Sequence, residues 1–105
     1  MNATKAQTAD LALVFRALSD PSRLAIFELV RECSALGEGQ SAQDLRQSAS
    51  EIAKRFDLSL STVSHHLREL RMAGLIRCER QGQRIFCTVN SDMLAEIEQF
   101  VRGRG

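Results

Sequence analysis

Apolar and polar residues alternate between Leu75 and Val89, on either side of a Gly82-Gln83 pair. This two-residue period is that of a β-strand with one buried face, and a glycine-containing pair between two such runs is typical of a tight hairpin turn. No other stretch of the chain shows the period convincingly. The sequence therefore predicts a single β-hairpin and assigns the other regular elements to helices.

Helical spacing dominates the first third of the chain. Apolar residues recur at intervals of three and four from Thr8 to Leu18, whereas the residues before Thr8 show no such stripe and are expected to be frayed. Asp20 and Pro21 indicate the start of a second helix, because aspartate can cap free amides and proline fits the first helical position. That helix is apolar on a broad face through Cys33, so it should lie centrally in the core.

The segment 34–47 interrupts the helical pattern. It holds two glycines and few apolar residues, so we interpret it as a loop insertion. The chain length of 105 residues is that of one domain, which we expect to span residues 1–105.

Two further helices are predicted after this segment. Ser48 and Glu51 have the spacing of a capping box, which predicts a short helix from Glu51 to Phe56. A tight turn separates it from a longer helix, which Ser59 can cap and which runs to about Ala73.

The order of elements suggests a fold. After the hairpin, Ser91 and Asp92 can cap a last helix. Two helices joined by a tight turn and followed by a hairpin define a winged helix-turn-helix. We therefore expect a mainly α fold of about five helices with a small two-stranded β-hairpin as its wing.

The helix that starts at Ser59 has two chemically different faces. On a wheel of 100° per residue, its core-facing side chains are Val63, Leu67 and Leu70. The opposite face carries Ser61, His65 and Arg68, with Thr62 and Ser64 on its flanks. A helix of this width fits the major groove of DNA, where its first turns reach the base edges. An ordinary surface helix is the alternative, but serine and threonine are poor helix formers and are not expected to crowd its exposed start.

Basic residues are concentrated in the same region. Between Lys54 and Arg84, seven Lys and Arg residues accompany three acidic ones, a net charge of +4 within a chain of net charge +1. This local surplus suits double-stranded DNA as a partner, although a solvated surface would show the same pattern. The hairpin tip adds Arg80, Gln83 and Arg84, which suit contacts to phosphates or to the minor groove.

The composition argues against several other classes of protein. Three cysteines without a Cys-x-x-Cys pair do not suggest a disulfide scaffold or a structural zinc site. No apolar run has the length of a membrane span and no secretory signal is evident, so a cytoplasmic protein is expected. We see no nucleophile–base constellation, phosphate-binding loop or metal cluster, and expect neither an enzyme nor a bound metal or cofactor.

Three segments resemble the ArsR/SmtB family of winged helix-turn-helix repressors: residues 58–76, 17–26 and 80–86. The resemblance covers most of the chain, from about Leu11 to Val101. It implies a homodimer that pairs through its first and last helices, binds a pseudo-palindromic DNA operator and represses transcription until a signal releases it. By the matched positions, the DNA-binding residues would be Ser59, Ser61, Thr62, Ser64 and His65. The geometry of the helix and wing adds Arg68, Arg80, Gln83 and Arg84.

The chain departs from the metal-sensing members of this family. Where members that sense soft metals often carry Cys-x-Cys, this chain has Ser48 and Ser50, and hydroxyls are poor ligands for such metals. Members that sense zinc or nickel often combine histidine with carboxylates on the last helix. Here that helix has only the carboxylates Asp92, Glu96 and Glu98. We interpret His66, near the buried edge of the Ser59 helix, as a partly buried structural residue.

The hairpin register places Cys78 directly opposite Cys87. The two residues suit the packed face of the wing, since free cysteine is usually buried. They also suit a thiol- or metal-responsive sensor, because such a pair could close a disulfide or hold a thiophilic ion. For the chain as a whole, a winged-helix module that binds another protein is a further alternative.

Overall fold

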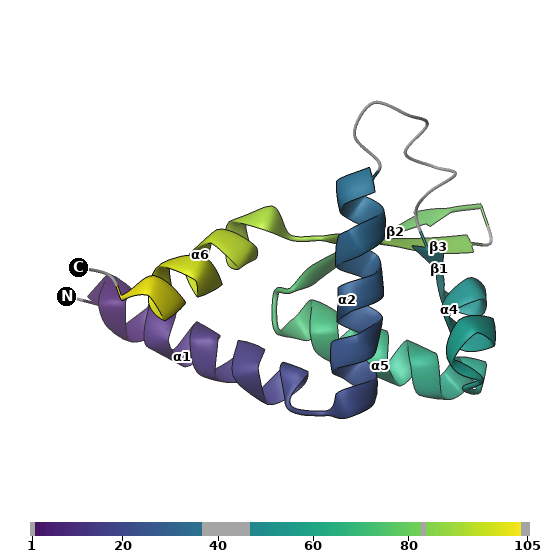
Figure 1. Ribbon diagram of the computed structural model, residues 1–105, viewed down its shortest axis with the longest axis horizontal. Coiled ribbons are helices and arrows are strands. Elements are labelled where there is room, and N and C mark those ends of the chain that lie inside the picture. The colour runs from purple at the N-terminus through teal and green to yellow at the C-terminus, as the bar shows by residue number, and fades with distance from the viewer. Residues whose placement is uncertain (1, 37–46, 83, 104–105) are drawn as a thin grey trace.

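The computed structural model describes residues 2–36, 47–82 and 84–103. In chain order, the elements are α1 (Asn2–Leu18), α2 (Pro21–Leu36), β1 (Gln47–Ser48), α4 (Ala49–Phe56), α5 (Leu60–Met72), β2 (Ile76–Gln81), β3 (Arg84–Val89) and α6 (Ser91–Arg102). In Figure 1, α2 stands in the middle, α1 and α6 extend to one side of it, and α4 and the hairpin lie on the other. The expected winged helix-turn-helix is confirmed.

The turn between α1 and α2 follows the sequence prediction. The Oδ2 atom of Asp20 accepts a hydrogen bond from the backbone N–H of Arg23 at 3.0 Å, and Pro21 is the first residue of α2. The side chain of Arg23 then reaches back, and its Nε donates to the carbonyl of Ala17 at 2.8 Å. The end of α1 is thereby tied to the start of α2.

Both helices are longer than the apolar pattern indicated. α1 begins at Asn2 and not at Thr8, because alanine, lysine and glutamine are good helix formers that extend a helix without an apolar stripe. α2 continues to Leu36, so the first residues of the predicted insertion 34–47 are helical. Residues 37–46 lie outside the described residues.

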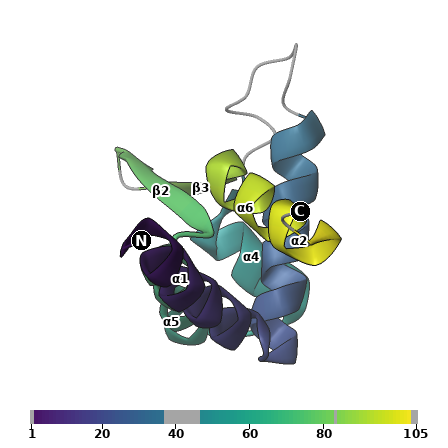
Figure 2. The same cartoon turned by 90° about the vertical axis from the view of Figure 1, so that its left-hand side faces the viewer.

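The sheet has one strand more than predicted. β2 and β3 pair antiparallel with Cys78 opposite Cys87, which confirms the predicted register. The short β1 pairs with the other edge of β3, so the strand order is β1-β3-β2 and Gln47 is not part of a loop. Figure 2 shows the β2–β3 hairpin projecting from the helices. β1 places Ser48, only 1% exposed, at the start of α4.

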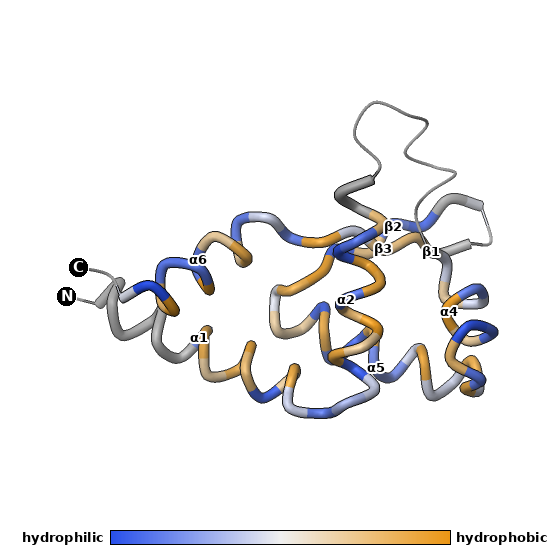
Figure 3. The backbone as a smooth tube through the Cα atoms, in the orientation of Figure 1, coloured by the Kyte–Doolittle hydropathy of each residue, from blue (hydrophilic) through white to orange (hydrophobic). Residues whose placement is uncertain are grey.

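The core lies where α2, α4 and α5 meet the base of the hairpin. Its largest enclosed side chains are Ile26, Ile52, Leu70 and Leu75. Figure 3 shows hydrophobic positions on α2 and α5 and along α1 and α6. None of the described helices combines the length and apolar character needed to cross a membrane.

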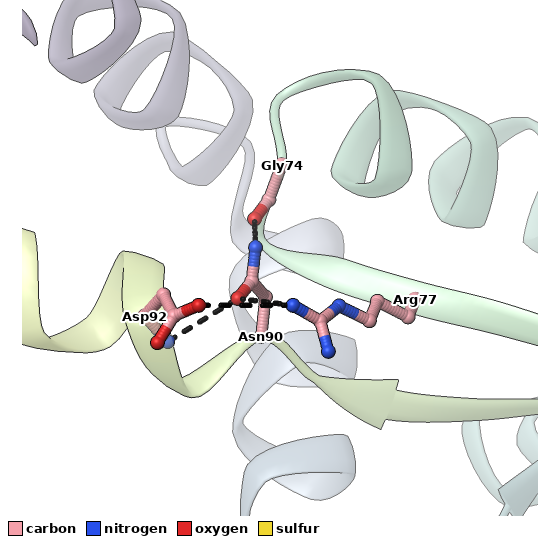
Figure 4. Close-up of polar contacts among 4 residues, drawn as sticks. All are labelled: Gly74, Arg77, Asn90 and Asp92. Carbon is pink, nitrogen blue, oxygen red and sulfur yellow. Dashed lines mark hydrogen bonds and ion pairs between the residues drawn. The ribbon is translucent and has the colours of Figure 1, made fainter.

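Asn90 joins three elements at the base of the hairpin (Figure 4). Its Nδ2 donates to the carbonyl of Gly74, just beyond α5, at 2.8 Å. Its Oδ1 accepts from Nη2 of Arg77 on β2 at 3.3 Å and from the N–H of Asp92 on α6 at 3.2 Å. Asn90 is therefore the N-cap of α6, and the predicted capping by Ser91 and Asp92 is wrong. Asparagine serves as well as serine in this role, so residue type alone did not separate the neighbouring candidates.

Asn90→Ala should lower the free energy of unfolding by about 1–3 kcal/mol, because it removes a helix cap and the donor that satisfies the Gly74 carbonyl. Urea denaturation followed by circular dichroism measures the change. Ser91→Ala, at the exposed next position, is the matched control and should change stability by less than about 0.5 kcal/mol. Equal stabilities of the two variants would contradict this role of Asn90.

Candidate nucleic-acid interface

A residue in the left-handed helical backbone conformation forms the turn between α4 and α5. Asp57 has a φ of 53°, a conformation that aspartate tolerates better than most residues. Its N–H donates to the carbonyl of Lys54 at 3.3 Å, and the N–H of Leu58 donates to the carbonyl of Ala53 at 3.0 Å. These bonds close the tight turn that the sequence predicted, and they lead the chain directly into α5.

Ser48 begins this helix-turn-helix unit. Its Oγ accepts from the N–H of Glu51 at 3.3 Å, as the capping box predicted. α4 starts at Ala49, two residues before the predicted Glu51, because a cap immediately precedes the first helical residue. The hydroxyl at this position is thus used within the protein.

α5 has the two faces that the helical wheel predicted. The buried side is formed by Val63, Leu67 and Leu70. The exposed side chains include four candidate DNA-binding residues, Ser61, Ser64, His65 and Arg68, while Thr62 is half-buried. A row of hydroxyl, imidazole and guanidinium groups therefore faces solvent, opposite the part of α5 that packs in the core.

Hydroxyl groups are bonded to one another at the start of α5. Ser59 is the N-cap, and its Oγ accepts from the N–H of Thr62 at 3.2 Å. The same Oγ donates to Oγ1 of Thr62 at 2.8 Å and lies 3.2 Å from Oγ of Ser61. Ser59, one of the candidate DNA-binding residues, therefore already has a structural role, and Thr62 is oriented by it.

The candidate residues of the wing are described less completely. Arg80 is exposed on β2, in the projecting hairpin. Gln83 lies outside the described residues. The backbone of Arg84 is in β3, opposite Gln81.

Sequence reasoning missed one residue at this surface. Leu60, the first residue of α5, is 54% exposed beside Ser61. Its spacing from Val63 and Leu67 is that of a core residue, which is why the pattern did not single it out. The first turn of α5 extends past the core, and an exposed leucine there can contact the methyl group of thymine.

Comparison with known proteins gives the family of this chain. A helix-turn-helix domain family matches residues 18–79. The transcriptional repressor SdpR of Bacillus subtilis is 35% identical over 83 residues, which cover 79% of each chain. An ArsR-like transcriptional regulator from Rhodococcus sp. RHA1 is 29% identical, with a TM-score of 0.66 over 90% of this chain and 76% of that one. This chain belongs to the ArsR family.

This ArsR family protein is a DNA-binding transcriptional regulator with the winged helix-turn-helix fold. The same fold occurs in a homodimeric DNA-binding domain from Mycobacterium bovis, a possible ArsR-family regulator. That domain is 24% identical and has a TM-score of 0.70 over 97% of this chain and 83% of its own.

His66 in this ArsR family protein is partly buried, as the sequence predicted. Burial lowers its pKa below the ordinary value of histidine, outweighing the opposite effect of Asp20, and so favours the neutral form of the ring. Its Nδ1 atom is buried and has no hydrogen-bond partner among the described residues. The ring packs within the protein, whereas that of the neighbouring His65 is exposed.

The potential metal ligands of this ArsR family protein are dispersed over its described part. Among residues 2–36, 47–82 and 84–103, no three His, Cys, Asp or Glu side chains are grouped so that they could hold a metal ion. On α6, Oδ2 of Asp92 lies 3.9 Å from Nη2 of Arg77, and Oε1 of Glu98 lies 3.0 Å from Nη2 of Arg102. Both carboxylates therefore form ion pairs at the surface.

Proposed function

We propose that this protein is a dimeric repressor that reads a pseudo-palindromic operator with two copies of α5. The observation that carries the proposal is the exposed row of Ser61, Ser64, His65 and Arg68, on the side of α5 opposite the core. In such a complex the two α5 helices lie in successive major grooves and the two wings lie beside them.

The side chains of this row suit base edges. An arginine such as Arg68 can pair with O6 and N7 of guanine, and serine hydroxyls can donate or accept. His65 can donate to N7, O6 or a phosphate. The exposed Arg80 on the wing suits a phosphate, a contact that fixes position and carries no sequence information.

An uncovered apolar face supports the dimer. Phe15 of α1 and Phe100 of α6 have ring centroids 5.5 Å apart, and both rings remain substantially exposed. Val101, the next residue of α6 after Phe100, is 72% exposed. Phe15, Phe100 and Val101 are called the α1–α6 face below. Pairing of two such faces would bury them and hold two α5 helices in fixed orientation, and the Mycobacterium bovis domain of the same fold is homodimeric.

Repression follows because the protein bound at the operator blocks the polymerase. The protein acts in the cytoplasm. A signal that changed the angle between subunits would release the DNA, a coupling that is typically about 1–3 kcal/mol.

The test begins with selection of operators from a random pool of double-stranded DNA. We expect an inverted repeat with half-sites centred about one helical turn apart, roughly 10 bp. Binding should weaken steeply with salt, with a logarithmic slope of about −0.9 per phosphate contact. Failure to enrich any sequence would remove the proposal and favour a protein-binding module.

Arg68→Ala and His65→Ala should each weaken operator binding without unfolding the protein. For a lost base contact worth about 1–3 kcal/mol, the dissociation constant rises about 5- to 150-fold. Mobility-shift titrations measure the change. Arg31→Ala, which removes an exposed arginine from α2, is the matched control and should alter affinity less than about twofold. Unchanged affinity in both α5 variants would refute the assignment of this face to DNA.

A further inference from the structure

Two thiols face each other within the wing. Cys78 on β2 and Cys87 on β3 are cross-strand partners, and their Sγ atoms lie 3.6 Å apart. A disulfide requires about 2.05 Å between the sulfur atoms, so a movement of roughly 1.5 Å would join them. The hairpin therefore holds a preformed dithiol pair without a covalent bond.

The two thiols differ in their access to solvent. Cys87 is 2% exposed and belongs to the buried core cluster. Cys78 is only half-buried and lines a pocket of about 200 Å³ between α4, α5 and β2. The other residues that line this pocket are Ala49, Ser64, Leu67, Arg68 and Arg71. A small oxidant can therefore reach Cys78 from the pocket, while Cys87 is shielded.

The two thiols also differ in acidity, and the more accessible Cys78 is the more acidic of the two. The hydrogen bond from the Cys87 thiol, helped by the Arg71 guanidinium and opposed by burial, lowers the pKa of Cys78 to about 7. The same hydrogen bond, together with burial, raises the pKa of Cys87. Cys78 is thus the thiolate of the pair and Cys87 the protonated neighbour. An accessible thiolate beside a second thiol is the arrangement of redox-sensing cysteines.

We propose that Cys78 and Cys87 form an oxidation site, at which a hydroperoxide converts the two thiols of one chain into a disulfide that weakens DNA binding. The oxidation itself is independent of the proposed function, whereas its effect on DNA rests on that function.

The chemistry proceeds in two steps. The Cys78 thiolate attacks one oxygen of hydrogen peroxide; an S–O bond forms, the O–O bond breaks, and the leaving hydroxide takes a proton to become water. Cys78 is now a sulfenic acid, oxidised by two electrons, and the peroxide is reduced. The sulfur of Cys87 then attacks that of Cys78; the S–S bond forms, the S–O bond breaks, and a second water leaves with the Cys87 proton.

The pocket connects this chemistry to the DNA-facing surface. Ser64 and Arg68 line the same pocket as Cys78, and Arg71 interacts electrostatically with its thiolate. Disulfide formation removes the negative charge that faces Arg71 and draws the Cys78 side chain towards Cys87, away from the pocket. Because α5 and the wing would bind DNA together, we expect operator affinity to fall about 5- to 150-fold on oxidation.

The experiment treats the full-length protein with hydrogen peroxide and measures intact mass and operator affinity in parallel. We expect the mass of the denatured chain to fall by that of two hydrogen atoms, and peptide mapping to link Cys78 to Cys87. Affinity should fall as above, and dithiothreitol should restore both values. Cys33→Ala is the matched control, since Cys33 is outside the pair, and it should respond like the natural chain.

Two variants separate the steps. Cys78→Ser, at the half-buried position, should neither form the disulfide nor lose affinity under peroxide. Cys87→Ala should stop at the sulfenic acid, which the trapping reagent dimedone labels at Cys78.

If all three thiols of the natural chain stay reduced, or if disulfides link two chains, the oxidation site is refuted. An internal disulfide with unchanged affinity refutes its effect on DNA. If the reduced protein binds no DNA, the proposed function fails, while the mass measurement still decides on the site.

Discussion

Phe100→Glu should separate the proposed dimer into monomers and lower operator affinity by about 10²- to 10⁴-fold, the usual gain from linking two binding modules. Phe100 is 50% exposed on the α1–α6 face, in ring contact with Phe15. A carboxylate there would have to be buried without a partner when two faces meet, which strongly opposes pairing. A monomer can occupy only one half-site, so the contribution of the second α5 helix is lost.

Light scattering after size-exclusion chromatography gives the mass, and mobility-shift titration gives the affinity. Ala95→Glu is the matched control, since this exposed residue lies about 140° around α6 from Phe100 and adds the same charge. It should remain dimeric and bind DNA normally. Phe100→Glu protein that is folded, dimeric and fully active would show that the subunits pair elsewhere.

Leu70→Ala should lower the free energy of unfolding by about 2–5 kcal/mol. The side chain is fully enclosed in the core, where α5 meets the other elements, and its removal leaves a cavity as well as lost apolar burial. Since domains of this size have about 5–15 kcal/mol of stability in total, this loss is a large fraction of it.

Thermal unfolding should show the loss of Leu70 as a decrease in Tm of at least about 8 °C. Leu60→Ala makes the same chemical change on the same helix, at a position that is 54% exposed, and should shift stability by less than about 0.5 kcal/mol. The control also tests function, because the shortened side chain should weaken contact with a thymine methyl group while the fold stays intact. Similar Tm values for the two variants would contradict the packing described for α5.

Local patterns were sufficient for those parts of the fold that depend on near neighbours. The buried positions Val63, Leu67 and Leu70 follow from helical periodicity, and the pairing of Cys78 with Cys87 follows from the position of the turn. By contrast, β1 is only two residues long, and it is a strand because β3 offers it an edge. A pairing between distant segments leaves no periodic trace in so short a piece of sequence.

The candidate site likewise has features that the sequence predicted and features that it did not. The wheel predicted which residues of α5 face solvent, because a straight helix with one buried side has only one outer side. The predicted cap by Ser59 is confirmed, but the sequence did not predict that the hydroxyls of Ser59 and Thr62 would be bonded to each other, since this depends on the cap geometry. Nor did it show that Leu60 is exposed, because its spacing matches that of the core and only the three-dimensional end of the core excludes it.

The bonds of Asn90 have a mechanical consequence. One side chain clamps the exit of α5, the base of β2 and the first turn of α6, so these three parts cannot swivel independently without breaking its hydrogen bonds. In the proposed dimer, each protomer would then behave as a stiff lever, with the proposed subunit contact at one end and the candidate DNA-binding helix at the other. A slight tilt at the contact would be delivered to the far end as a larger displacement, and neither α5 nor the hairpin would need to refold.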